Sequence, residues 1–186
     1  MLSLTKQRQA MSTRSMWRQY RNVPAWILPQ AWRTWVLDKG SLTKRLINAS
    51  QGDFAVRVVF QGWAYPSLDE AEALGIPCRR KALIREVELL CFGEPWVQAR
   101  SVIPNSTLTG QERQLRYLGN RPLGAFLFKS RTMRRKAIEV AALNAQGNIP
   151  VYGRRSVFLL HEKPLLVSEL FLPSVLMARP KLRTQL

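Results

Sequence analysis

The feature that most restricts the fold of this chain is the run from Lys81 to Pro104, KALIREVELLCFGEPWVQARSVIP. Strand-forming residues lie on both sides of Phe92-Gly93-Glu94-Pro95, where glycine and proline are typical of a hairpin turn. A second pair of such runs, SVFLLHE and LLVSELFLP, is joined at Lys163-Pro164. Strands joined by so short a connection pair antiparallel. The sequence therefore predicts a sheet made of antiparallel neighbours.

The rest of the chain contains both strand and helix patterns. Apolar residues at every second position from Phe54 to Phe60 predict a half-buried strand, and the run from Arg131 to Leu143 predicts more strand. Between Pro24 and Ile47 the spacing predicts mainly helix, divided at Gly40-Ser41, with Ser41 capping the second part. A short acidic helix or loop is expected in SLDEAEALGIP, residues 67–77.

The segment after Pro104 is a second helical insertion. Its leucines at positions 115, 118, 123 and 127 have helical spacing, with a break at Gly119-Asn120-Arg121-Pro122 and with Ser106 or Thr107 as the cap. This pattern predicts a helix, a turn and a second helix. Roughly six strands joined by hairpins, with the helices grouped in two insertions, indicate one α+β domain with an antiparallel sheet.

The ends of the chain differ from this domain in composition. The first 22 residues contain five basic residues and no acid, which fits an organellar transit peptide or a flexible basic arm, and Met11 is an alternative start. The last residues, MARPKLRTQL, are polar and basic. We therefore expect a basic arm over residues 1–23, a domain over residues 24–175 and a basic tail over residues 176–186.

Charge and motifs exclude several classes of function. With 29 Lys and Arg against 12 Asp and Glu, the net charge of +17 favours anionic partners: nucleic acid, acidic lipid or small carboxylates. The single His161 and the unclustered Cys78 and Cys91 do not make a zinc site, although a disulfide remains open. His161 is expected to face solvent. No nucleotide-binding motif is present, and no apolar run reaches the ~18 residues of a membrane span.

Two charged residues lie inside strand-forming runs. Arg85 is flanked by Ile84 in ALIREVELL, and Glu169 lies in the apolar run LLVSELFLP. Either residue could face outward or form a salt bridge. If both point inward, they create a cavity with an arginine fork for a carboxylate and a desolvated glutamate that can bind a hydroxyl or move a proton. The ligand implied is a small aromatic or cyclic acid.

Four motifs in this order resemble a known family. They are SLTKRL, IREVELLCFGEPWVQARSVIPNSTLTG, LGNRPLGAFLF and YGRRSVFLLHEKPLLVSELFLP, which together extend over most of the chain. The chain resembles the chorismate pyruvate-lyases, which convert chorismate to 4-hydroxybenzoate and pyruvate at the start of ubiquinone biosynthesis. The resemblance implies a six-stranded antiparallel sheet, helix-turn-helix flaps over an internal ligand, and no metal or cofactor.

The resemblance also implies roles for individual residues. Arg85 should bind the ring carboxylate, and Glu169 should face the 4-oxygen of the ring, near the bond that breaks. Leu42 and Leu123 match positions that contact ligand through the main chain, although the family often has Met at the position of Leu42. For the second carboxylate of chorismate the candidates are Arg154 and Arg155, unless one of them forms a structural ion pair.

Other functions remain open at this stage. A related fold serves some transcription regulators as an effector-binding module, so the chain could be an aromatic-acid sensor without catalysis. The cluster KSRTMRRK, from Lys129 to Lys136, is the best candidate for nucleic-acid binding. The same positive charge would also allow peripheral contact with an anionic membrane. We expect a cytoplasmic monomer.

Overall fold

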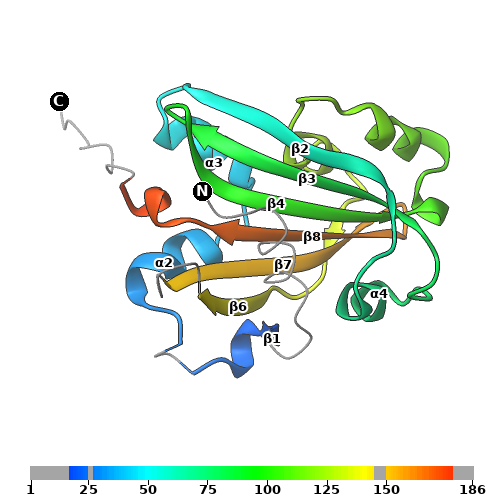
Figure 1. The fold of residues 1–186 in the computed structure, drawn as a ribbon, viewed down its shortest axis with the longest axis horizontal. Helices are drawn as coiled ribbons and strands as arrows, with labels where there is room; N and C mark the ends of the chain where they lie inside the picture. The colour runs from blue at the N-terminus through cyan, green and yellow to red at the C-terminus, as the bar shows by residue number, and fades with distance from the viewer. Residues whose placement is uncertain (1–16, 25–26, 145–149, 178–186) are drawn as a thin grey trace.

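The computed structural model describes residues 17–24, 27–144 and 150–177, which form an α+β domain around one antiparallel sheet (Figure 1). The strand order is β1-β6-β7-β8-β4-β3-β2, and β5 also pairs with β7. The strands are β1 (Arg18–Gln19), β2 (Phe54–Ala64), β3 (Ala82–Cys91), β4 (Glu94–Pro104), β5 (Arg134–Arg135), β6 (Glu139–Asn144), β7 (Pro150–Leu160) and β8 (Lys163–Phe171).

The predicted fold class is confirmed, with a small difference in strand number. The described residues form eight strands rather than six, because the two-residue strands β1 and β5 join the sheet as well. β1 and the 3-10 helix η1 (Tyr20–Asn22) lie in the segment expected to be an arm, so the folded part begins before residue 24. Residues 1–16 and 178–186 of the expected arm and tail lie outside the described residues.

The two predicted hairpins are both present, but the first turn is shorter than expected and the second lies two residues earlier in the chain. Phe92 and Gly93 alone connect β3 to β4, with φ angles of 54° and 75°. In the second hairpin the turn is His161–Glu162, with φ angles of 47° and 63°, and not Lys163-Pro164. Two successive positive φ angles match the twist of the flanking strands, which is why such turns close hairpins.

The first helical insertion follows the prediction closely. α2 (Gln30–Val36) and α3 (Leu42–Ala49) are separated near Gly40, and the Ser41 side chain accepts a hydrogen bond from the Lys44 backbone N–H. The acidic segment forms α4 (Leu68–Leu74), which begins with a capping box between Ser67 and Glu70. Among the described residues, no helix has the length and apolarity needed to cross a membrane.

The second helical insertion differs from the prediction in its type of helix. It begins with the 3-10 helices η2 (Asn105–Thr107) and η3 (Gly110–Tyr117) and ends with α5 (Leu123–Leu127); a fourth 3-10 helix, η4 (Pro173–Met177), follows β8. Ser106 and Thr107 do not cap a helix, because both lie within η2, where the Thr107 hydroxyl donates to the Pro164 carbonyl at 2.6 Å. The predicted leucines of this insertion are all buried.

The sheet has two covered faces, and they differ in chemistry. Side chains of α2, α3 and α5 pack over one face, which carries Leu83, Leu89, Phe158 and Phe171. α4 packs against the other face, beside Ile84 and Leu166. Cys78 and Cys91 are free thiols, so the disulfide that the sequence left open does not form.

Candidate functional site

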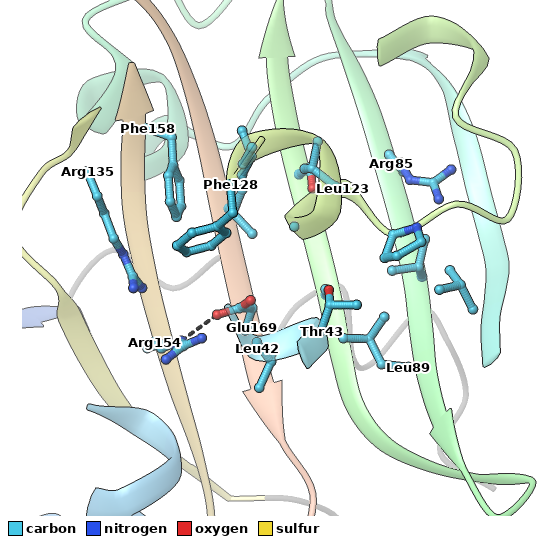
Figure 2. A pocket seen from close by; sticks show the side chains of 18 of the residues that line it. Leu42, Thr43, Arg85, Leu89, Leu123, Phe128, Arg135, Arg154, Phe158 and Glu169 are labelled. Atoms are coloured by element: carbon cyan, nitrogen blue, oxygen red, sulfur yellow. Dashed lines mark hydrogen bonds and ion pairs between the residues drawn. The ribbon is translucent and has the colours of Figure 1, made fainter. Parts of the chain in front are cut away.

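A cavity lies between the N-terminal ends of α3 and α5 and the face of the sheet that α2, α3 and α5 cover (Figure 2). Its walls are mostly apolar, but four charged side chains line it as well: Arg85, Arg135, Arg154 and Glu169. Its volume of about 50 Å³ is enough for a few water molecules but not for a substituted ring. The structure therefore shows the site closed, and a ligand can enter only when one of its walls moves.

Arg85 is a buried cation with neutral partners. It extends from β3 and is 1% exposed. Its guanidinium donates to the Gln61 side-chain oxygen at 2.8 Å and to the carbonyls of Gly119 and Arg121 at 2.8 and 3.2 Å. No carboxylate among the described residues pairs with it, and burial lowers its pKa. The salt bridge considered from the sequence is therefore absent from the described part of the chain, and this site lacks an anion.

Glu169 lies on β8 directly opposite Arg154 of β7 and forms an ion pair with it. Arg154 is also anchored at the end of α2, because it donates to the carbonyls of Trp35 and Asp38 at 3.3 and 2.6 Å. The pair uses Oε2 of Glu169, and no hydrogen bond from the described residues reaches Oε1. One carboxylate oxygen is therefore fixed by Arg154, while the other has no donor among the residues that the structure describes.

Arg135 is a third cation at this site, and it was not predicted. Its Nε donates to the Ser156 hydroxyl at 3.0 Å, and its guanidinium carbon lies 5.1 Å from the centre of the Phe158 ring. Burial, reinforced by the charge of Arg154, lowers the pKa of Arg135 to about 10. In the sequence it belongs to the basic cluster from Lys129 to Lys136, but adjacent strand residues such as Arg134 and Arg135 point to opposite sides of the sheet.

The wall formed by α3 and α5 is held together by a close contact. Leu42 and Thr43 begin α3, Leu123 and Gly124 begin α5, and all four line the cavity. A Cβ atom added to Gly124 would lie 2.8 Å from the Thr43 hydroxyl oxygen, which is closer than side chains normally approach. We call these two helix ends the lid. Leu42 and Leu123 thus lie at the cavity, where the sequence placed them.

Arg155, in contrast, does not reach the cavity. Its side chain pairs with Asp69 of α4 and with Glu139 of β6, both at 2.6 Å. It lies on the other face of the sheet, because successive residues of β7 alternate between faces and Arg154 occupies the cavity side. The expectation that Arg155 binds substrate is therefore wrong, and the structural ion pair considered as its alternative is what the structure shows.

His161 does not belong to the cavity either. Its side chain is 48% exposed, and its Nδ1 lies 2.7 Å from Glu112 of η3. Lys163 contacts the other oxygen of Glu112 at 2.9 Å. Within the described residues no group of His, Cys, Asp and Glu is placed to hold a metal ion. The chemistry that the cavity offers is thus that of three guanidinium groups and one carboxylate.

Taken together, the fold and the cavity define a small-molecule-binding α+β protein. The site has a net positive charge, apolar walls and a carboxylate beside its cations, which suits a ring that carries more than one acidic group. A protein-family model described as "Chorismate lyase" matches residues 11–181. The chain therefore belongs to the chorismate lyase family.

Individual relatives agree with this assignment. The chain is 48% identical over 154 residues to "Probable chorismate pyruvate-lyase" of Methylococcus capsulatus, a match covering 77% of this chain and 95% of the relative. It is 38% identical over 159 residues to "Chorismate pyruvate-lyase" of Salmonella arizonae, covering 84% and 90% of the two chains.

The fold itself is shared with a different group of proteins. A GntR-family transcriptional regulator from Bacillus cereus superimposes with a TM-score of 0.51 at 11% identity, covering 72% of this chain and 99% of that one. At such low identity the likeness concerns the fold alone.

Proposed function

We propose that this chain converts chorismate to 4-hydroxybenzoate and pyruvate. The observation that carries the proposal is the closed cavity in which Arg85, buried among neutral acceptors, is found together with Glu169. Membership of the family and the names of the relatives point to the same reaction. The charge of the site supports it further, because chorismate carries two carboxylates.

Arg85 is the proposed anchor for the ring carboxylate. Its three described contacts are to neutral oxygens, so it retains N–H groups and an uncompensated charge for an incoming carboxylate. Charge-assisted hydrogen bonds of this kind are roughly twice as strong as neutral ones. Leu42 and Leu123 are the proposed main-chain contacts of the bound ring, because they begin the two helices of the lid.

Glu169 is the proposed partner of the ring's 4-hydroxyl group. In the reaction the bond between ring carbon 3 and the ether oxygen breaks, carbon 4 loses its proton, and the enol of pyruvate gains a proton on its methylene carbon. Atoms balance without an oxidant or reductant, so the proposed reaction uses no cofactor. Oε1 of Glu169 is free to accept the hydrogen bond or the proton, while Arg154 holds Oε2. Most of the acceleration comes from orientation and from fixed charges.

The wider context is also proposed by analogy with the family. We place the reaction at the start of ubiquinone biosynthesis and the protein in the cytoplasm, as a monomer. Peripheral contact with an anionic membrane would follow from the net charge of +17. Sedimentation with anionic liposomes at low and high salt tests that contact, which is absent if no protein sediments at either salt concentration.

The main experiment follows both products from chorismate by chromatography, using EDTA-treated protein. Wild type should release 4-hydroxybenzoate and pyruvate in equal amounts, and Arg85→Ala and Glu169→Gln should be strongly impaired. Arg134→Ala and Glu162→Gln serve as matched controls, because these residues form an ion pair in which both side chains are 67% exposed. Full activity of Glu169→Gln would refute the role of Glu169.

A sensor without catalysis is the second candidate, because the fold resembles that of a transcriptional regulator. Such a protein would bind 4-hydroxybenzoate and leave chorismate intact in the same assay. Nucleic-acid binding is disfavoured, because the basic cluster from Lys129 to Lys136 is divided: Arg135 lines the cavity and Arg134 pairs with Glu162.

A further inference from the structure

The charges of the cavity do not balance among the described residues. Glu169 pairs with Arg154, which leaves Arg85 and Arg135 without a carboxylate partner in the part of the chain that the structure describes. Figure 2 shows Arg135 and Arg154 on the side of the cavity opposite Arg85, with Glu169 nearer to Arg154. The site therefore has two separate positions that lack an anion.

The contacts of Arg135 do not satisfy its guanidinium group. Its hydrogen bond to Ser156 uses Nε, and its next contact, from Nη1 to the Asp38 carbonyl, is at the limiting distance of 3.5 Å. That carbonyl already accepts a shorter hydrogen bond, 2.6 Å, from Arg154. The Asp38 carboxylate is engaged elsewhere, by Arg45 at 3.0 Å and by the Gly40 backbone N–H at 2.7 Å.

The electrostatic environment leads to the same conclusion. The pKa of Arg135 falls to about 10 because burial and the charge of Arg154 outweigh the opposing effects of Glu169 and Asp38. An arginine in ordinary surroundings stays charged at all accessible pH values. A bound carboxylate would restore the balance, and the ether side chain of chorismate carries one.

We propose that Arg135 binds the carboxylate of the enolpyruvyl side chain, so that Arg85 and Arg135 hold the two carboxylates of the substrate from opposite sides of the cavity. This assignment rests on the proposed function and replaces Arg155. It makes Arg135 a specificity-determining residue, because 4-hydroxybenzoate has only the carboxylate that Arg85 binds. It also holds the departing pyruvate beside Glu169.

The test compares two inert ligands by calorimetric titration. One is 4-hydroxybenzoate, with one carboxylate, and the other is 3-(carboxymethoxy)-4-hydroxybenzoate, which keeps the 4-hydroxyl and carries a second carboxylate on the ether at ring carbon 3, where the side chain of chorismate is attached. Arg135→Gln should weaken binding of the diacid by about 10- to 100-fold, in line with hydrogen bonds to charged groups. Binding of the monoacid should change by less than about threefold. Arg134→Gln, which removes the same charge from the exposed neighbour, should change neither.

A second variant separates binding from folding. Ser156→Ala removes the hydroxyl that positions Arg135 and leaves the charge in place, so it should weaken the diacid selectively but less. Equal losses for both ligands, or no loss with either Arg135→Gln or Ser156→Ala, would overturn the proposal. A further outcome is that wild type yields no products from chorismate while Arg135→Gln still weakens binding of the diacid and not of the monoacid. In that case the proposed reaction fails and Arg135 remains a carboxylate site.

Discussion

Replacing Gly124 by alanine tests whether the close approach of α3 and α5 controls closure of the site. The new Cβ would lie 2.8 Å from the Thr43 hydroxyl oxygen, so the helices must separate by about 0.6 Å before the contact reaches the ordinary 3.4 Å. Thr43 cannot easily turn away, because it is buried and its branched side chain has few rotamers in a helix. The substitution therefore opposes the closed lid.

The magnitude follows from two effects. Alanine stabilises α5 by up to about 1 kcal/mol relative to glycine, but it does so whether the lid is open or closed, so closure is unaffected. Overpacking costs about 1–3 kcal/mol and acts wherever α3 and α5 approach each other closely, which in the proposed complex includes the ligand-bound state with the lid over the ring. Because about 1.4 kcal/mol corresponds to a tenfold change, the Kd of 4-hydroxybenzoate should rise by about 5- to 150-fold.

The assay measures the Kd and the dissociation rate of 4-hydroxybenzoate for Gly124→Ala, Thr43→Ala and the double variant. Thr43→Ala removes the hydroxyl, after which the nearest remaining atom to the added Cβ is the Thr43 Cβ position at 3.8 Å, an ordinary contact. The double variant should therefore bind nearly as tightly as Thr43→Ala alone. If Gly124→Ala binds normally, or if the double variant shows no recovery, closure does not depend on this contact.

Three further predictions concern charged groups. Glu169→Gln should lower kcat by about 100-fold or more and also lower the melting temperature, because Arg154 loses its charged partner in the interior; an unchanged melting temperature would contradict the second part. The KM for chorismate should rise as the pH passes about 10, where Arg135 loses its proton, and this rise should be smaller in Arg135→Gln. For Glu112, burial raises the pKa, but contacts with Lys163 and His161 lower it overall. Its contribution to stability is therefore fully present above the usual carboxyl pKa and is lost as the pH falls through the lowered pKa of the folded state, so Glu112→Gln should reduce the melting temperature at pH ~7 and by progressively less as the pH falls.

The hairpins show what the sequence can and cannot specify. Gly93 marks the first turn because glycine adopts positive φ without strain. The second turn consists of His161 and Glu162, which also have positive φ but carry no such signal, so the adjacent Pro164 was mistaken for the turn. Pro164 is tolerated inside β8 because pairing with β4 begins only at Leu166.

The site was predictable only in part, for a related reason. Motifs located Arg85 and Glu169, but β7 is buried on both faces, so its sequence does not reveal whether Arg154 or Arg155 faces the cavity. Pairing of Arg154 with Glu169 across the sheet decides this. Arg135 reaches the cavity through the pairing of the two-residue strand β5 with β7, a contact that local sequence patterns do not encode.

The contacts of Arg85 have a consequence for how this protein can diverge. Arg85 holds the loop before α5 by donating hydrogen bonds to the backbone carbonyls of Gly119 and Arg121. A backbone carbonyl is present at each position whatever the side chain. Substitutions at Asn120 can therefore accumulate while the loop stays in place. Position 121 is less free, because the Arg121 side chain donates to the carbonyls of Leu118 and Tyr117, and position 119 is restricted by its φ of 54°. Because the proposed ligand anchor also holds this loop in place, selection for faster product release would not act on Arg85 without weakening substrate capture, and would act on the lid instead.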